Sequence, residues 1–90
     1  MIKIELIPTL NRCIEGTARQ EFLKSVDEYM QKGKRDRKLE EKAGLLKLFL
    51  ETMDFRKLRV ESEKHLVEGK KVRFILYLKK GKPKYELKVD

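Results

Sequence analysis

The sequence predicts a single α+β domain in which a two-helix hairpin packs on one face of a four-stranded, mostly antiparallel sheet, in the order β-α-α-β-β-β. Hydrophobic residues recur with a helical period over residues 17–53, whereas they alternate with polar residues near the start of the chain and after residue 57. The chain has 90 residues, which is enough for one hydrophobic core and too few for two, so residues 1–90 form one domain.

The first predicted element is a short strand at residues 2–6. Ile2, Ile4 and Leu6 alternate with charged residues, as expected for a strand with one buried face. Pro8 then ends the strand because it has no backbone N–H group to offer a neighbouring strand.

The first helix is predicted at residues 17–32. Thr17 and Gln20 have the spacing of a capping box, so the helix is expected to begin at Thr17. Gly33 is placed to end it in a left-handed conformation. Five apolar residues form one stripe at helical spacing: Ala18, Phe22, Val26, Tyr29 and Met30.

The second helix is predicted at residues 37–53, with Asp36 as its N-cap. Its apolar face is wider than one contact requires, which indicates either a position between the first helix and the sheet or a face that also seals a symmetric homodimer. Gly44 lies inside this helix, where glycine costs about 1 kcal/mol relative to alanine. We therefore expect another helix to approach closely at Gly44.

Three further strands are predicted at residues 58–64, 72–79 and 83–89. Leu58 and Val60 alternate with charged residues, and the same alternation is clearer in the two later segments. The connections are short and contain Gly69 and Gly81, so these strands are expected to form an antiparallel meander. If both helices cover one face, Ile75 and Tyr77 lie on the other face among basic residues.

The chain is strongly basic, with 23 Lys and Arg against 15 Asp and Glu, a formal net charge of +8 and an isoelectric point near 9.7. Residues 1–33 are balanced, with five basic and five acidic side chains, so the excess lies in the rest of the chain. Clustered cations bind polyanions by releasing counterions. The same lysines also suit solvation of exposed turns and edges, or an acidic protein partner.

We predict a nucleic-acid interface, for RNA or another single strand, because Tyr77 offers a stacking surface among cations. Its residues are expected to lie in the connection between the helices, in the two hairpin turns and on the outer face of the central strand: Lys34, Arg35, Arg37, Lys38, Lys70, Lys71, Arg73, Tyr77, Lys79, Lys80, Lys82 and Lys84.

Several other classes of protein and site are disfavoured. Cys13 is the only cysteine and His65 the only histidine, so we expect no disulfide, no metal site and no cofactor, and a reducing compartment. No secretory signal and no apolar stretch of about 18 residues is present, which predicts a cytoplasmic protein without a membrane partner. The scarcity of Asn and Gln is typical of thermophilic proteins.

The sequence shows no nucleophile placed beside an oriented base, which favours a non-catalytic protein. The segment Lys71-Val72-Arg73-Phe74-Ile75-Leu76-Tyr77 is similar to a basic and hydrophobic third strand in which one toxin family carries an arginine. Together with the predicted element order, it resembles the RelE/ParE superfamily of bacterial and archaeal toxins, which cleave ribosome-bound messenger RNA or poison gyrase.

The resemblance implies that Arg73 takes the place of that arginine. The chain departs from the family in its second predicted strand and in its end at Asp90, before the tail that often supplies a catalytic His or Tyr. If RNA were cleaved, the candidates to stabilise charge or move protons would be Arg59, His65, Arg73 and Tyr85. The preferred function is therefore nucleic-acid binding without catalysis, and the alternatives are a RelE-like messenger RNA ribonuclease or a protein adaptor.

Overall fold

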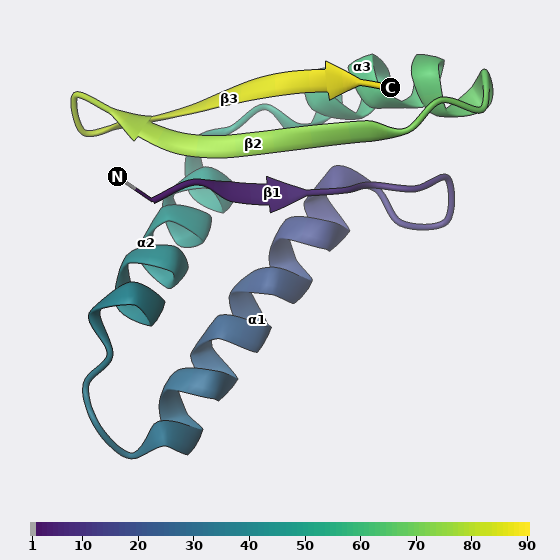
Figure 1. Cartoon of the computed structure of the whole chain (residues 1–90). Coiled ribbons are helices and arrows are strands. Elements are labelled where there is room, and N and C mark those ends of the chain that lie inside the picture. Colours follow the sequence, from purple (N-terminus) through teal and green to yellow (C-terminus); the bar gives the residue numbers. More distant parts are fainter. Residues whose placement is uncertain (1) are drawn as a thin grey trace.

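The computed structural model of the protein describes residues 2–90 and contains three helices and three strands there. The elements follow in the order β1 (Ile4–Leu6), α1 (Ile14–Lys32), α2 (Arg37–Thr52), α3 (Phe55–Val67), β2 (Val72–Lys79) and β3 (Lys82–Val89) (Figure 1). The α+β class is confirmed, whereas the predicted architecture of two helices and four strands is wrong. None of the helices in this part of the chain is long and apolar enough to cross a membrane.

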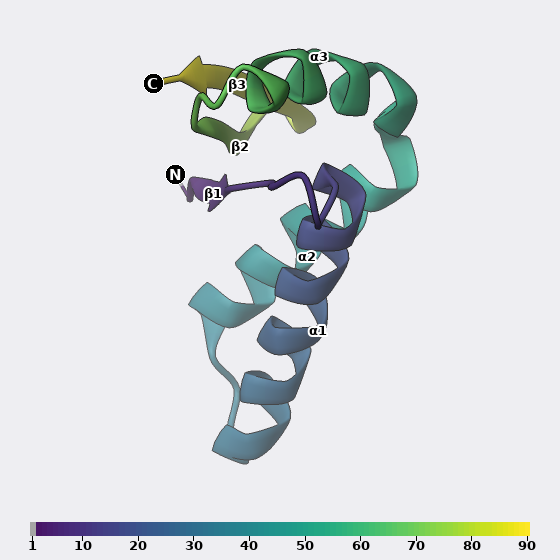
Figure 2. The ribbon, with the colours of Figure 1, turned by 90° about the vertical axis from the view of Figure 1, so that its right-hand side faces the viewer.

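The sheet is antiparallel with the strand order β1-β2-β3, so β2 is central. Ile4 lies opposite Leu76, and Phe74 lies opposite both Leu6 and Leu87. Directly opposed residues point to the same face of a sheet, so these apolar side chains form one face. Figure 2 shows the sheet nearly end-on, with α3 and the sheet-proximal ends of α1 and α2 on one side of it and the other side open.

The core lies where the helices meet the apolar face of the sheet. Its buried members come from every element except β3: Ile4, Leu6, Ile14, Ala18, Leu45, Leu46, Phe49, Leu58, Val72, Phe74 and Leu76. Phe49 of α2 and Phe55 of α3 contact edge to face, with ring centroids 5.4 Å apart. This cluster holds all three helices against the sheet.

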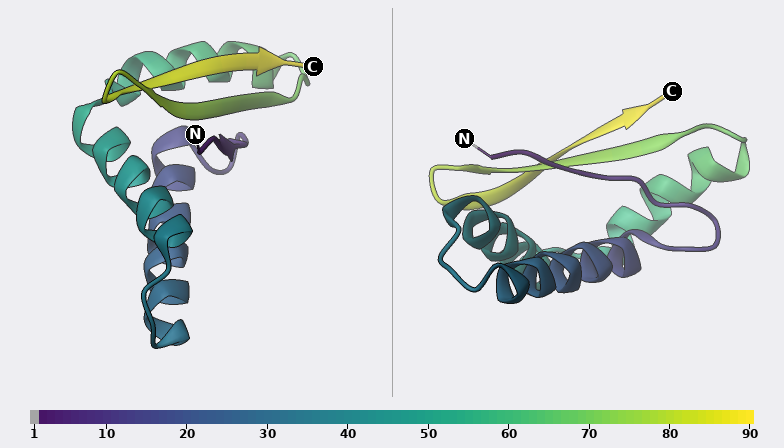
Figure 3. Two further views of the ribbon diagram at one scale, coloured as in Figure 1. Left: turned by 60° about the vertical axis from the view of Figure 1, so that its left-hand side comes forward. Right: turned by 60° about the horizontal axis from the view of Figure 1, so that its bottom comes forward.

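The outer halves of α1 and α2 form an arm that projects away from the sheet (Figures 1 and 3). Within residues 19–44 only Ser25 is fully buried, because the two helices there contact little besides each other. The predicted ends of the arm are confirmed. Gly33 ends α1 with φ of 65°, and the Asp36 carboxylate accepts a hydrogen bond from the Leu39 N–H at 3.2 Å.

The predicted start of the first helix at Thr17 is wrong, because α1 begins at Ile14 with Cys13 as its N-cap. Thr17 lies within the first turn and its hydroxyl donates to the Cys13 carbonyl at 3.0 Å. Ile14 is completely buried, so core packing favours the longer helix.

The largest correction concerns the predicted strand at residues 58–64, which lies within α3. The Asp54 carboxylate caps this helix by accepting from the backbone N–H groups of Arg56 and Lys57. A strand would place Leu58 and Val60 on one face, but Leu58 is 1% exposed and Val60 67% exposed. Helical spacing instead places Leu58 beneath the sheet and Val60 in solvent.

The expected close helix contact at Gly44 is also wrong. A Cβ atom added to Gly44 would meet no atom within 4 Å outside its own part of the helix. Gly44 is exposed, so the packing of this chain does not require a glycine at this position.

Candidate nucleic-acid interface

The open face of the sheet has a basic end, which lies next to the β2–β3 turn. In the last row of the sheet Lys79 lies directly opposite Lys82, and in the next row on this face Tyr77 lies opposite Lys84. Continuation of the β1–β2 register places Lys3, which precedes β1, on the other side of Tyr77. The lysines are exposed and Tyr77 is half-buried. This end of the face therefore surrounds one aromatic ring with cations.

We call this surface the basic half-face and define it, with the turn, as Lys3, Tyr77, Lys79, Lys80, Lys82 and Lys84. The ion pairs found among residues 2–90 include none of its lysines. Its positive charge is consequently not neutralised within the described part of the chain.

The turn itself has an unusual composition for its geometry. Lys80 and Gly81 are the two loop residues of the hairpin, with φ of 54° and 75°. Both values are positive, as in a type I′ turn, where Asn and Gly are the usual residues. Lys80 therefore occupies a backbone conformation that L side chains rarely adopt, and Lys79 faces a like charge on Lys82. Like charges directly opposite each other destabilise a strand pair.

An acidic row ends the basic half-face. Glu5 and Glu86 lie on either side of Ile75, two residues along β2 from Tyr77. Beyond this row, the Arg73 guanidinium Nε lies 3.3 Å from a carboxylate oxygen of Asp90, and its Nη1 lies 3.9 Å from one of Glu5. Arg73 is thus paired within the chain and is separated from the lysine cluster by two carboxylates.

The remaining predicted residues of the sheet lie at its other end. Lys70 and Lys71 precede β2, whereas Lys79 ends it, so the length of an eight-residue strand separates them. That length is about 25 Å. Lys70 also pairs with Glu68 at 3.0 Å. The two predicted hairpin clusters are therefore distant from one another.

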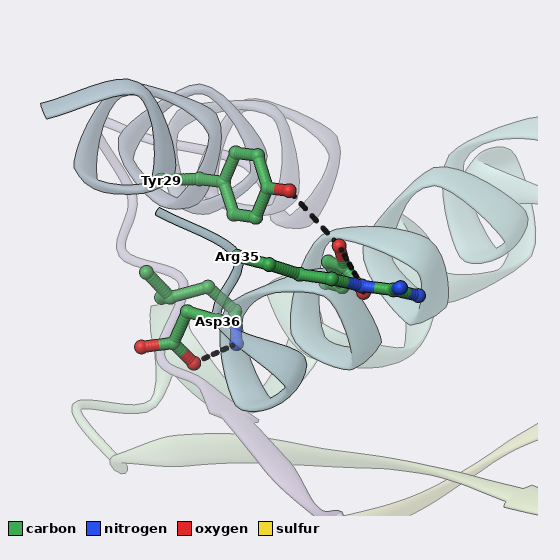
Figure 4. Close-up of polar contacts among 5 residues, drawn as sticks. Tyr29, Arg35 and Asp36 are labelled. Atoms are coloured by element: carbon green, nitrogen blue, oxygen red, sulfur yellow. Dashed lines mark hydrogen bonds and ion pairs between the residues drawn. The ribbon is translucent and has the colours of Figure 1, made fainter. Parts of the chain in front are cut away.

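The connection between α1 and α2 forms a second basic site at the tip of the arm. Tyr29 donates a hydrogen bond to Glu40 at 2.9 Å, and Arg35 Nε lies 3.1 Å from the same carboxylate (Figure 4). Lys32 pairs with Asp36 at 2.6 Å. These contacts neutralise Arg35 and Lys32 but leave three predicted residues without an ion pair among the described residues: Lys34, Arg37 and Lys38.

The same contacts shift the pKa values of the groups that brace the tip. The hydrogen bond from Tyr29 lowers the pKa of the Glu40 carboxyl and raises that of the Tyr29 phenol. The hydrogen bond from Lys32 lowers the pKa of Asp36, helped by the backbone N–H of Leu39. The carboxylates that hold the tip are therefore ionised at neutral pH.

The twelve predicted residues thus lie in three separate places. The basic half-face contains five of them: Tyr77, Lys79, Lys80, Lys82 and Lys84. Lys3 was not among the predicted residues, and it joins this surface because β1 pairs with β2. The alternation of Lys3 with Ile2 and Ile4 was the available signal, since it places Lys3 on the polar face of the first strand.

The four candidates for RNA cleavage are not brought together. Arg73 is on the open face, whereas Tyr85 is on the helix side, where its hydroxyl donates to Glu61 at 3.3 Å. Burial of the Tyr85 phenol, with the nearby Glu61 charge, raises its pKa. His65 lies on α3, and Arg59 pairs with Glu63 on the same helix at 2.8 Å. These side chains therefore do not share one site.

Comparison with known proteins gives one match. A protein-family model for an uncharacterised family matches residues 1–87. No curated protein and no solved structure matches the chain.

Proposed function

The chain belongs to this uncharacterised family, matched over residues 1–87, and we propose that it binds single-stranded nucleic acid, with RNA as the expected ligand, through the basic half-face. One observation carries the proposal. Five lysines that form no ion pair among residues 2–90 surround Tyr77 at one end of the open face of the sheet, and the residues described in their two rows include no carboxylate.

The proposed roles of these side chains follow from their chemistry. Lysine ammonium groups bind phosphate oxygens, and each contact releases counterions from the nucleic acid. An aromatic ring on a sheet offers a surface on which an unpaired base can stack. The ring of Tyr77 lies between Lys3 and Lys84, so a base on the ring would have phosphates within reach of both lysines. A duplex does not expose its base faces in this way.

The construction of the hairpin turn also supports a binding role. The Lys79–Lys82 pair and the positive φ of Lys80 both disfavour the hairpin relative to the residues that such turns usually contain. A bound polyanion removes the repulsion between the lysines. A requirement for polyanion binding explains why this turn contains three lysines, which folding alone does not favour.

Replacement of Tyr77 tests the proposal. Fluorescence anisotropy with a labelled ten-nucleotide RNA should show that Tyr77→Ala weakens binding about 5-fold to 150-fold, which corresponds to about 1 to 3 kcal/mol of lost stacking. Tyr77→Phe is the matched control, since it keeps the ring, and it should bind like the wild type. Binding to a duplex of the same length should change little in either variant. Equal losses on single strand and duplex would contradict the stacking role.

The proposal is for binding without cleavage. Labelled RNA and translating ribosomes incubated with the protein should leave the message intact on a gel. Discrete cuts that disappear in Arg73→Ala would favour the RelE-like ribonuclease instead, and salt-independent binding would favour neither function.

A further inference from the structure

The outer edge of β3 has no partner in the described part of the chain. The strand order is β1-β2-β3, so β3 pairs with β2 along one edge only and borders the sheet (Figure 1). It has eight residues, as many as the central strand, whereas β1 has three. An unpaired edge of this length presents a row of backbone N–H and C=O groups that can pair with another strand.

The hydrogen bonds at the end of β3 show which of its residues direct these groups outward. The Asp90 N–H donates to the Lys71 carbonyl at 2.9 Å, and the Lys71 N–H donates to the Asp90 carbonyl at 3.3 Å. In an antiparallel pair, residues that bond to the partner strand alternate with residues that do not. The outward N–H groups of β3 therefore belong to the residues that alternate with Asp90: Tyr85, Leu87 and Val89.

The helix side of β3 is also less well covered than the rest of the sheet. Phe74 and Leu76 of β2 are completely buried, whereas their partners Leu87 and Tyr85 on β3 are only partly buried. Val89 is 36% exposed. Burial of such side chains against a further strand would be favourable. The edge thus offers both backbone groups and apolar surface to a partner strand.

The open side of β3 carries charges without partners. Lys84, Glu86 and Lys88 are exposed and form no ion pair among residues 2–90. Lysines on an edge strand usually oppose its pairing with other chains. Pairing becomes favourable in a register that places each of these lysines opposite a carboxylate.

One antiparallel register of β3 with a second copy of β3 meets this condition. With Leu87 of one copy opposite Leu87 of the other, Glu86 of each copy lies opposite Lys88 of the other copy. Lys84 of each copy likewise lies opposite Asp90, which also pairs with an arginine of its own chain. Two-fold symmetry repeats each pair, so four opposite-charge pairs form and no like charges are opposed.

The two neighbouring registers oppose like charges. A pair centred on Glu86 would place Glu86 opposite Glu86 and Lys84 opposite Lys88. A pair centred on Lys88 would place Lys88 opposite Lys88 and Glu86 opposite Asp90. Like charges directly opposite each other destabilise a strand pair. The charges of β3 therefore select the register centred on Leu87.

The same register satisfies the backbone and the apolar side chains. Tyr85 of each copy lies opposite Val89 of the other, so the outward groups of these residues and of Leu87 pair in about six hydrogen bonds. Pro83, which has no N–H group, lies beyond the paired segment. A register centred on Tyr85 would instead place Pro83 opposite Leu87 and lose hydrogen bonds there.

We propose that two copies of the chain form a symmetric dimer by antiparallel pairing of their β3 strands about Leu87. The product is a six-stranded sheet in the order β1-β2-β3-β3-β2-β1. The open faces of both copies lie on the same side of this sheet, because the two-fold axis is perpendicular to it. The turn lysines of each basic half-face lie outside the paired segment, and dimerisation does not require a nucleic acid.

Charge exchange at Glu86 and Lys88 tests the register. Light scattering and sedimentation without nucleic acid, at about 50 mM salt, should show a wild-type dimer. Glu86→Lys and Lys88→Glu should each weaken dimerisation on the order of tenfold or more, because each change turns two favourable pairs into two repulsive ones. The double variant, and an equimolar mixture of the two single variants, should dimerise like the wild type, since both again place lysine opposite glutamate.

Glu51→Lys is the matched control, because it makes the same charge change as Glu86→Lys at an exposed position of α2, and it should leave the dimer intact. A monomeric wild type would overturn the proposal. So would single variants that dimerise as tightly as the wild type, or a mixture of the two that associates no more tightly than either variant alone.

Disulfide formation provides an independent test in a Cys13→Ser background, which removes the exposed native thiol. Leu87→Cys would place two cysteines directly opposite each other with Cα atoms about 5.5 Å apart, within the range of a disulfide. Val89→Cys would separate them by about 13 Å along the strands, beyond that range. Oxidation should link two chains in the first variant and not in the second on a non-reducing gel. Equal linkage in both variants, or linkage in neither, would overturn the proposal.

Discussion

Neutralisation of the lysines at the hairpin turn should weaken RNA binding without lowering the free energy of unfolding. The variant replaces Lys79, Lys80 and Lys82 with Gln, which removes three of the five charges of the basic half-face. For single strands, the logarithm of the binding constant falls with the logarithm of salt concentration with a slope of about −0.7 per phosphate contact. Five contacts predict a slope of about −3.5 for the wild type, and two contacts predict about −1.4 for the variant.

These slopes give a large and measurable difference. Between 50 and 200 mM salt, the wild-type affinity should fall about a hundredfold and that of the variant about sevenfold. The free energy of unfolding should not decrease, because the variant removes the repulsion between Lys79 and Lys82, worth about 0.2 to 1 kcal/mol. A loss of binding therefore cannot come from a loss of folding.

The assay is anisotropy against a ten-nucleotide RNA across the salt range, with urea unfolding in parallel. The control replaces Lys24, Lys57 and Lys64 with Gln. These exposed lysines lie on α1 and α3, and their replacement changes the net charge equally. The same reduction in slope for both variants would refute the reasoning, because binding would then depend on net charge and not on the half-face.

Three further predictions concern the fold and the assembly. Leu58→Ala should lower the free energy of unfolding by about 2 to 5 kcal/mol, whereas Val60→Ala should change it by about 0.5 kcal/mol or less, and equal effects in urea unfolding would argue for a strand at these positions. The pKa of the Glu40 carboxyl is lower in the folded protein than in the unfolded chain. The ionised carboxylate therefore increases the free energy of unfolding at pH values above the unfolded pKa, and this contribution is lost as the pH falls through the folded pKa. Melting temperatures from pH 7 to pH 3 should therefore fall less steeply in Glu40→Gln, and identical acid profiles would contradict this. The sequence placed a symmetric homodimer on the wide apolar face of the second helix, but Leu45, Leu46 and Phe49 of that face lie in the core, so the exposed helical surface that remains for a dimer is on α1, where Leu23 is 59% and Met30 72% exposed. Because the proposed dimer pairs β3 instead, light scattering should give twice the chain mass for Met30→Lys as for the wild type; reduction to one chain mass by Met30→Lys would place the dimer on α1, and a wild-type monomer would exclude it.

The helical arm and the β2–β3 hairpin could be predicted because local signals specify them. Asp36 caps α2 and Gly33 ends α1 through contacts within a few residues, so the chain itself encodes these boundaries. The alternation in residues 72–79 places Phe74 in the core, and the short turn at Gly81 fixes the register of the pair. Neither prediction needed knowledge of distant parts of the chain.

The segment 55–67 could not be assigned in this way, because its sequence fits two periods. Leu58 and Val60 match a strand, whereas Phe55, Leu58 and Ser62 match one face of a helix. Asp54, a residue type that favours the N-cap of a helix, was the signal for a helix in this segment, whereas the predicted strand rested on the alternation at Leu58 and Val60. Burial decides between the two periods, since the apolar face of the sheet must be covered along its length and the sheet-proximal ends of α1 and α2 cover only part of it.

The sequence by itself determined the α+β class, the cap at Asp36, the end of α1 at Gly33, the turn between β2 and β3, and the excess of lysine at the ends of the strands. Only the tertiary structure decided which charges share a surface. Lys3 joins Tyr77 because β1 pairs with β2, whereas Lys70 and Arg73 are held by Glu68, Asp90 and Glu5. The physical reason is that a charge count along the chain carries no information about pairing across strands, and cross-strand neighbours set whether a cation is neutralised or free to bind a ligand.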